Sequence, residues 1–119
     1  MRINQTRLAI VYESLAKLPP FSRWKLLPSE LITFKLTKDP DFYGRFTEGE
    51  SAEPPLIEIN PEMCDTFEEI VRTMAHEMIH LRQYLTGGIK PCRNGGHCKK
   101  FNRLARQVCE AFDWDLGTF

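Results

Sequence analysis

Two histidines and a glutamate lie close together in the segment His76-Glu77-Met78-Ile79-His80. At roughly 1.5 Å and 100° per residue, a helix would place His76 and His80 on one face, about 6 Å apart along its axis. Two neutral imidazoles in that position can share one Zn²⁺ ion. Glu77 can then reach a water molecule held on the ion and take its proton, which is the chemistry of metal-assisted hydrolysis. The segment therefore predicts a water-activating site with Zn²⁺ as cofactor and Glu77 as the catalytic base.

The motif requires a helix, and its surroundings predict one from Thr66 to about Leu85. The segment Thr66-Phe67-Glu68-Glu69 has the form of a capping box, and no Pro or Gly follows before Gly87-Gly88. Most apolar side chains of this helix share an arc that excludes both histidines, namely Phe67, Ile70, Val71, Met74, Met78, Leu81 and Leu85. Histidines that only pack in the core would fall within that arc, so their position favours metal binding.

A catalytic zinc ion usually has three protein ligands, and the chain contains one further histidine, His97. It follows a loop rich in Gly and Pro and begins a second helical pattern. Its arc on that pattern is shared by Phe101, Leu104, Ala105, Val108, Ala111 and Phe112. If this helix packs on the first, the three imidazoles converge, and we expect His76, His80 and His97 to be the metal ligands. The alternative for His97 is a partly buried histidine near a helix N-terminus.

The segment HEMIH followed by GGHCKKF resembles the SprT-like domain of Spartan and related proteins, in which HExxH precedes a third histidine in a GHGxxF-like segment. Upstream, ITFKLTK, FYGRFTEGE and PLIEINPEM resemble the strands that precede the motif helix in that family. The resemblance covers about residues 31–119 and implies a minimal zincin-like metallopeptidase. Cys98 stands where the family commonly has Gly, which puts a thiol beside the third ligand. Because the chain ends at Phe119, we expect no zinc-ribbon or DNA-binding extension.

The segments ahead of the motif predict a helix followed by strands. Apolar residues with helical spacing precede Pro19-Pro20, namely Leu8, Val11, Tyr12, Leu15 and Leu18. Leu31 to Thr37 alternates apolar and polar residues, and Phe42 to Thr47 and Leu56 to Asn60 are two further short strand candidates. The expected fold class is α+β, in one domain over residues 1–119. It combines an N-terminal helix, a small three-stranded antiparallel or mixed sheet, the HExxH helix and a C-terminal helix that carries the third zinc ligand.

One predicted strand lies directly before the motif helix and is a candidate for substrate binding. If it forms the sheet edge that borders the cleft, a peptide can add beside it through main-chain hydrogen bonds. The residues expected to bind substrate are Leu56, Ile57, Glu58, Ile59 and Asn60. The resemblance implies the same arrangement and a broad peptide specificity, whereas the alternative is an ordinary covered strand. Tyr84, one turn after His80, is a candidate for stabilising the oxyanion.

The net charge is zero, but the charged residues are segregated along the chain. Residues 47–69 contain eight acidic and no basic residues, and residues 82–106 contain seven basic and no acidic ones. On the last helix the basic side chains point away from the apolar arc, and we expect four of them to contact a nucleic-acid backbone: Lys99, Lys100, Arg103 and Arg106. The family resemblance makes DNA the expected nucleic acid. The alternative is a solvated face that pairs with the acidic stretch.

Length and composition fit one compact domain, with 119 residues, 42% hydrophobic and 27% charged. The sequence has no apolar run near 18 residues and no charged-then-apolar leader, so we expect a cytoplasmic monomer without membrane partners, associated with the nucleoid if it binds DNA. The four cysteines, at positions 64, 92, 98 and 109, form no C-x-x-C pair, which is typical of reduced thiols. The alternative is that Cys92 and Cys98 bind metal or form a disulfide.

Three functions are compatible with these features. The leading one is a SprT-like zinc metalloendopeptidase that hydrolyses protein substrates, including proteins bound or crosslinked to DNA, which would be a role in DNA–protein crosslink repair. The second is a non-catalytic, zinc-stabilised module that binds nucleic acid. The third is another HExxH peptidase that cuts one regulator protein, such as a phage or plasmid repressor. Glu77 favours an enzyme, because a structural zinc site needs no adjacent carboxylate and is more often closed by a fourth ligand, usually Cys.

Overall fold

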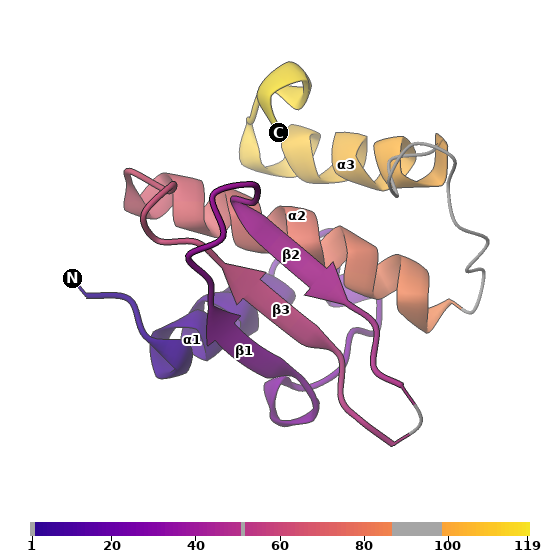
Figure 1. The fold of residues 1–119 in the computed structure, drawn as a ribbon. Coiled ribbons are helices and arrows are strands. Elements are labelled where there is room, and N and C mark those ends of the chain that lie inside the picture. The colour runs from indigo at the N-terminus through magenta and orange to yellow at the C-terminus, as the bar shows by residue number, and fades with distance from the viewer. Residues whose placement is uncertain (1, 51, 87–98) are drawn as a thin grey trace.

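A computed structural model describes residues 2–50, 52–86 and 99–119, and within them the chain has the α+β architecture expected from its sequence (Figure 1). In chain order the main elements are α1 (Gln5–Ala16), β1 (Thr33–Leu36), β2 (Gly44–Thr47), β3 (Leu56–Ile59), α2 (Phe67–Leu85) and α3 (Lys99–Phe112). Helix α2 contacts α1 and strands β2 and β3, and it also contacts α3. None of the described helices is long and apolar enough to cross a membrane.

The sheet is mixed, with the strand order β1-β3-β2. Strand β1 is parallel to β3, and β2 is antiparallel to it, so that Phe34 and Phe46 both lie opposite Ile57. The central strand is therefore β3, and β2 is one of the two edges. The prediction that Leu56–Asn60 forms the edge bordering the cleft is wrong, because main-chain groups on both sides of β3 already pair with neighbouring strands.

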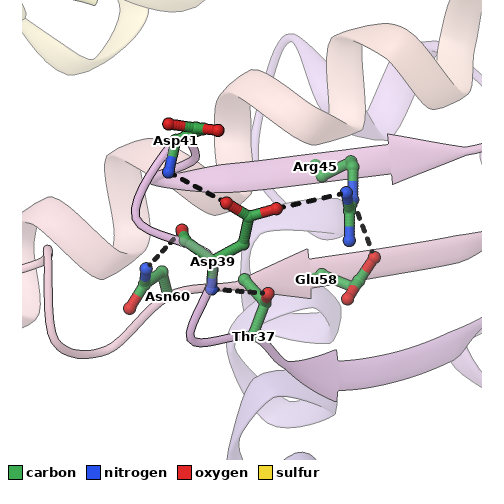
Figure 2. Close-up of polar contacts among 6 residues, drawn as sticks. All are labelled: Thr37, Asp39, Asp41, Arg45, Glu58 and Asn60. Carbon is green, nitrogen blue, oxygen red and sulfur yellow. Dashed lines mark hydrogen bonds and ion pairs between the residues drawn. The ribbon is translucent and has the colours of Figure 1, made fainter.

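Asn60 directly follows β3, and its polar atoms connect three segments of the chain; Figure 2 shows its hydrogen bond to Asp39. It is buried, with 1% of its surface exposed. Its backbone N–H donates to the carbonyl of Tyr43 at 2.8 Å, and Nδ2 donates to the carbonyl of Asp39 at 3.0 Å. Its Oδ1 accepts from the N–H of Glu62 at 3.0 Å. Asn60 therefore anchors the β1–β2 connection and the turn into α2, which is a structural role; its contact with substrate stays a prediction.

Glu58, another residue expected to bind substrate, is paired with a cation on the adjacent strand. Arg45 Nε donates to Glu58 Oε1 at 3.0 Å, and Arg45 Nη1 lies 3.8 Å from Asp39 Oδ2 (Figure 2). Arg45 and Glu58 are opposite each other in the β2–β3 register. Opposite charges at facing positions favour this pairing of strands. The pair thus helps fix the register that brings β2 alongside α2.

Helix α2 begins where the capping box predicts. Thr66 is the N-cap, and its Oγ1 accepts from the N–H of Glu69 at 3.1 Å. The Glu69 carboxylate reaches back to the N–H of Asp65 at 2.8 Å, one residue before the cap itself. Two N-terminal N–H groups are satisfied in this way, which stabilises the first turn. The helix ends at Leu85, with Thr86 as its C-cap, as the sequence indicates.

The buried face of α2 is wider than the predicted arc. Ile70, Met74, Met78 and Leu81 are buried as expected, but Phe67 at the first turn is 52% exposed. Ala75, Glu77 and Ile79 are buried as well. The reason is that α2 lies between the sheet and α3, so that two sides of the helix are covered (Figure 1).

The two outer helices pack by the faces that their patterns predict. Helix α1 buries Leu8, Val11, Tyr12 and Leu15, whereas Leu18 lies beyond its last turn and is 46% exposed. Helix α3 buries Phe101, Ala105, Val108 and Cys109, and Ala111 near its end is exposed. In Figure 1, α3 runs beside α2 in the opposite direction, so the first turn of α3 lies near the last turns of α2.

Candidate metal centre

Helix α2 brings His76 and His80 together on one face, as predicted. Their ring centroids are 5.3 Å apart, and the ring planes are inclined at 63°. Two imidazoles bound to one tetrahedral ion, each through a nitrogen about 2.0–2.1 Å away, would have ring centres about 5 Å apart. The two side chains therefore fit a shared Zn²⁺ ion. Both are half-buried, so a ligand can approach while the low polarity of the surroundings strengthens binding.

Glu77 lies beneath β2, next to the two histidines in sequence. It is 4% exposed, and a β-carbon added to Gly44 would be 3.1 Å from its Oε2. Burial raises the pKa of Glu77 from 4.5 to about 8, because the ionised carboxylate loses its hydration. A buried carboxyl group with a strongly raised pKa beside two histidines is a candidate for proton transfer.

Aromatic rings from three other parts of the chain surround the histidines. Phe101, in the first turn of α3, has its ring centroid 4.9 Å from that of His76 and 4.7 Å from that of His80. Phe46 on β2 is stacked with His80 at 6.5 Å, and Phe119 lies 5.5 Å from His76. These rings restrict the orientations of both imidazoles and limit their contact with water.

The sequence analysis did not identify these aromatic residues as part of the site. Phe101 is four residues after His97 and lies on the predicted inward face of α3, so its position could have indicated it. Gly44 and Phe46 alternate on the face of β2 that turns toward α2, but a four-residue strand is too short for that pattern to be informative. No sequence signal indicates Phe119.

The third predicted ligand, His97, lies outside the described residues, as do Cys92 and Cys98. Its place in the site therefore stays a prediction. Within residues 2–50, 52–86 and 99–119, no group of three metal-ligating side chains occurs. Cys64 and Cys109 are buried free thiols, in agreement with the expected reduced state.

Helix α3 presents its basic side chains to solvent. Lys99, Lys100, Arg103 and Arg106 are all exposed, as predicted. In the described part of the chain, the ion pairs within 4.0 Å are those of Arg45, and none involves these four side chains. Tyr84 is half-buried and lies in the same row of α2 as the histidines, with its ring 5.9 Å from that of Phe46. Its contact with an oxyanion stays a prediction.

Comparison with known proteins gives one match. The model of the SprT-like family matches residues 39–117, which include β2, β3, α2 and α3. No curated protein and no solved structure matches the chain.

Proposed function

The chain belongs to the SprT-like family, whose members are generally zinc peptidases, and we propose that it is a zinc-dependent endopeptidase that hydrolyses peptide bonds in proteins. One observation carries the proposal. Two imidazoles with their ring centroids 5.3 Å apart share a helix with a carboxylate that is buried beside them. A structural zinc site would gain nothing from that carboxylate, whereas hydrolysis requires a group that accepts and returns a proton.

The residues act as follows in this proposal. His76, His80 and the predicted third ligand His97 hold the ion, which when bound polarises the peptide carbonyl and acidifies a water molecule. Glu77 accepts the proton that this water loses as its oxygen attacks the carbonyl carbon. Glu77 holds this proton on its carboxyl group until the C–N bond breaks. Glu77 then gives the proton to the leaving amine nitrogen.

The edge strand β2 is the proposed binding place for the substrate backbone. In the described sheet, β2 pairs only with β3 and leaves its other edge available. It runs along α2, with Gly44 against Thr73 and Glu77 and with Phe46 beside His80. A substrate strand added to that edge by main-chain hydrogen bonds would pass the two histidines. Because these bonds involve only the substrate backbone, the enzyme would discriminate weakly between substrate side chains.

The proposal is tested by incubating an unfolded protein substrate, such as reduced casein, with the wild type, with Glu77→Gln and with a matched control, Glu68→Gln. Glu68 is an exposed carboxylate in the first turn of the same helix. We expect cleavage by the wild type and the control, loss of cleavage on chelation with recovery on adding zinc, and no cleavage by Glu77→Gln. Equal cleavage by Glu77→Gln would refute the role of Glu77. Zinc binding without any cleavage by the wild type would favour the non-catalytic module.

We further propose DNA as a partner, bound by α3, so that proteins attached to DNA are the substrates. The support is an exposed row of four cations without acidic partners among the described side chains. Reversing two charges, Lys100→Glu with Arg103→Glu, is expected to weaken DNA binding and reduce the slope of log K against log salt by about 2. The matched control reverses two exposed lysines, Lys35 in β1 and Lys38 just after it. Equal loss in both variants would argue against an interface on α3.

A further inference from the structure

The chain reverses direction after α3 and folds back toward α2. Asp113 has a positive φ of 57°, and the N–H of Trp114 donates to the carbonyl of Cys109 at 2.9 Å. A short 3₁₀ turn follows at Leu116–Thr118, capped by Asp115, whose Oδ1 accepts from the N–H of Gly117 at 2.9 Å. We call residues 114–119 the C-terminal turn. In Figure 1 it is the yellow segment that bends back over the end of α3.

Arg72 of α2 contacts the C-terminal turn through a hydrogen bond and an aromatic ring. The Arg72 Nη2 donates to Thr118 Oγ1 at 2.8 Å, and the guanidinium carbon lies 5.8 Å from the centre of the Trp114 ring. Trp114 in turn stacks on Phe119, with ring centroids 5.9 Å apart and planes inclined at 24°. Arg72 precedes His76 by four residues on α2, so its hydrogen bond to Thr118 lies one helical turn from the first proposed metal ligand.

The result of this arrangement is a contact between Phe119 and His76. Their ring centroids are 5.5 Å apart, and the planes are inclined at 51°. The same imidazole also contacts Phe101 of α3, at 4.9 Å and 56°. Two rings from two different segments therefore restrict the rotation of His76 about its side-chain bonds. Phe101 also contacts the His80 ring, and the ring of Phe119 contacts that of His76.

We propose that the C-terminal turn positions the first zinc ligand: Phe119 holds the His76 imidazole in its metal-binding orientation, and the Arg72–Thr118 hydrogen bond keeps Phe119 in place. Phe119 acts through His76 and is a positioning residue, not a catalytic one. The inference rests on the zinc site of the proposed function. A ligand whose orientation is fixed before the metal arrives loses less freedom on binding, so the turn raises zinc affinity.

The test measures zinc affinity by competition with a chromophoric chelator, together with the absorption spectrum of the Co²⁺-substituted protein, which reports ligand geometry. An aromatic contact of this kind corresponds to about a 3- to 10-fold change in affinity. We expect Phe119→Ala to weaken zinc binding by that factor and to alter the Co²⁺ spectrum, and Phe119→Tyr to restore both. Thr118→Val removes the hydrogen bond from Arg72 and the one that Thr118 Oγ1 donates to the carbonyl of Asp115 at 3.2 Å, and it should show a smaller change in the same direction.

The matched control is Leu116→Ala, which truncates a side chain of the same turn that is 41% exposed, and it should bind zinc as the wild type does. Wild-type zinc affinity and an unchanged Co²⁺ spectrum in Phe119→Ala would overturn the inference, even if the KM for a peptide rose. This failure differs from failure of the proposed function, in which the wild type itself binds no zinc or cleaves no protein.

Discussion

Gly44 is a point of close approach between the edge strand β2 and helix α2, and adding one methyl group there tests that packing. A β-carbon at this position would lie 2.6 Å from Thr73 Cγ2 and 3.1 Å from Glu77 Oε2. Both distances are shorter than ordinary van der Waals contacts of about 3.5–4.0 Å. Gly44 has no positive φ, so the backbone itself accepts alanine. Any loss of stability in Gly44→Ala therefore comes from close contacts, of which the shortest is with Thr73 of α2; the β-carbon would also lie 3.1 Å from the carbonyl oxygen of Glu58 in β3.

The expected magnitude follows from two opposing terms. Forcing one methyl group into a packed interface costs about 1–3 kcal/mol. Replacing glycine in a strand returns about 0.5–1 kcal/mol, because the unfolded chain becomes less flexible. We expect a net loss of about 1–2 kcal/mol in the free energy of unfolding. If β2 moves away from α2 and Thr73 keeps its position, water reaches the Glu77 carboxyl group. The pKa of Glu77 then falls back toward 4.5.

The assay is urea unfolding in excess chelator, so that zinc binding does not contribute. Thr73→Ser removes the colliding methyl group and keeps the hydroxyl, which lies 3.6 Å from Cys64 Sγ. In the double variant the two changes should compensate by about 1 kcal/mol or more relative to their sum. Gly117→Ala is the control, since its β-carbon would meet nothing closer than 3.4 Å. If Gly44→Ala is as stable as this control, or if the cycle is additive, the contact between β2 and α2 is wrong.

Two further predictions concern buried polar side chains. Because the folded-state pKa of Glu77 is raised from 4.5 to about 8, the folded protein binds this proton more tightly than the unfolded chain, and stability falls as pH rises between those values. In chelator, the wild type should lose several kcal/mol relative to Glu77→Gln between pH 5 and pH 8, at about 1.4 kcal/mol per pKa unit; parallel urea-unfolding profiles would contradict this. Asn60→Ala leaves the carbonyl of Asp39 and the N–H of Glu62 without their side-chain partner and should cost about 2–4 kcal/mol. Exposed Asn102→Ala is its control in urea, and an equal midpoint for the two variants would contradict the network.

The local features of the fold could be predicted from the sequence because they depend on neighbouring residues. The capping box at Thr66 and the apolar spacing through Leu81 define α2 without reference to the rest of the chain. The same is true of the buried face of α1 and of the outward basic face of α3. Leu36 falls on the apolar side of the alternation from Leu31 to Thr37, but it is the last residue of β1 and 39% exposed.

The order of the strands could not be predicted, because pairing between β1 and β3 joins segments about twenty residues apart and alternation does not encode it. The assignment of an edge to Leu56–Asn60 failed for that reason. In the sequence, Asn60 is a polar residue at the end of a predicted strand. Only the tertiary structure shows that its side chain is buried and donates a hydrogen bond to the carbonyl of Asp39. The contact of Phe119 with His76 depends on the reversal of chain direction at Asp113. No periodic pattern in the sequence predicts that reversal.

The most direct test of the zinc site is the zinc content of the purified protein, measured by native mass spectrometry for the wild type and for His97→Ala. His97 is the ligand that sequence spacing predicts to complete the pair formed by His76 and His80. We expect one zinc ion per wild-type chain and a marked loss of zinc from His97→Ala under a mild chelator. Full retention of zinc by His97→Ala would contradict the three-histidine site, and a wild type without zinc would contradict the metal centre itself.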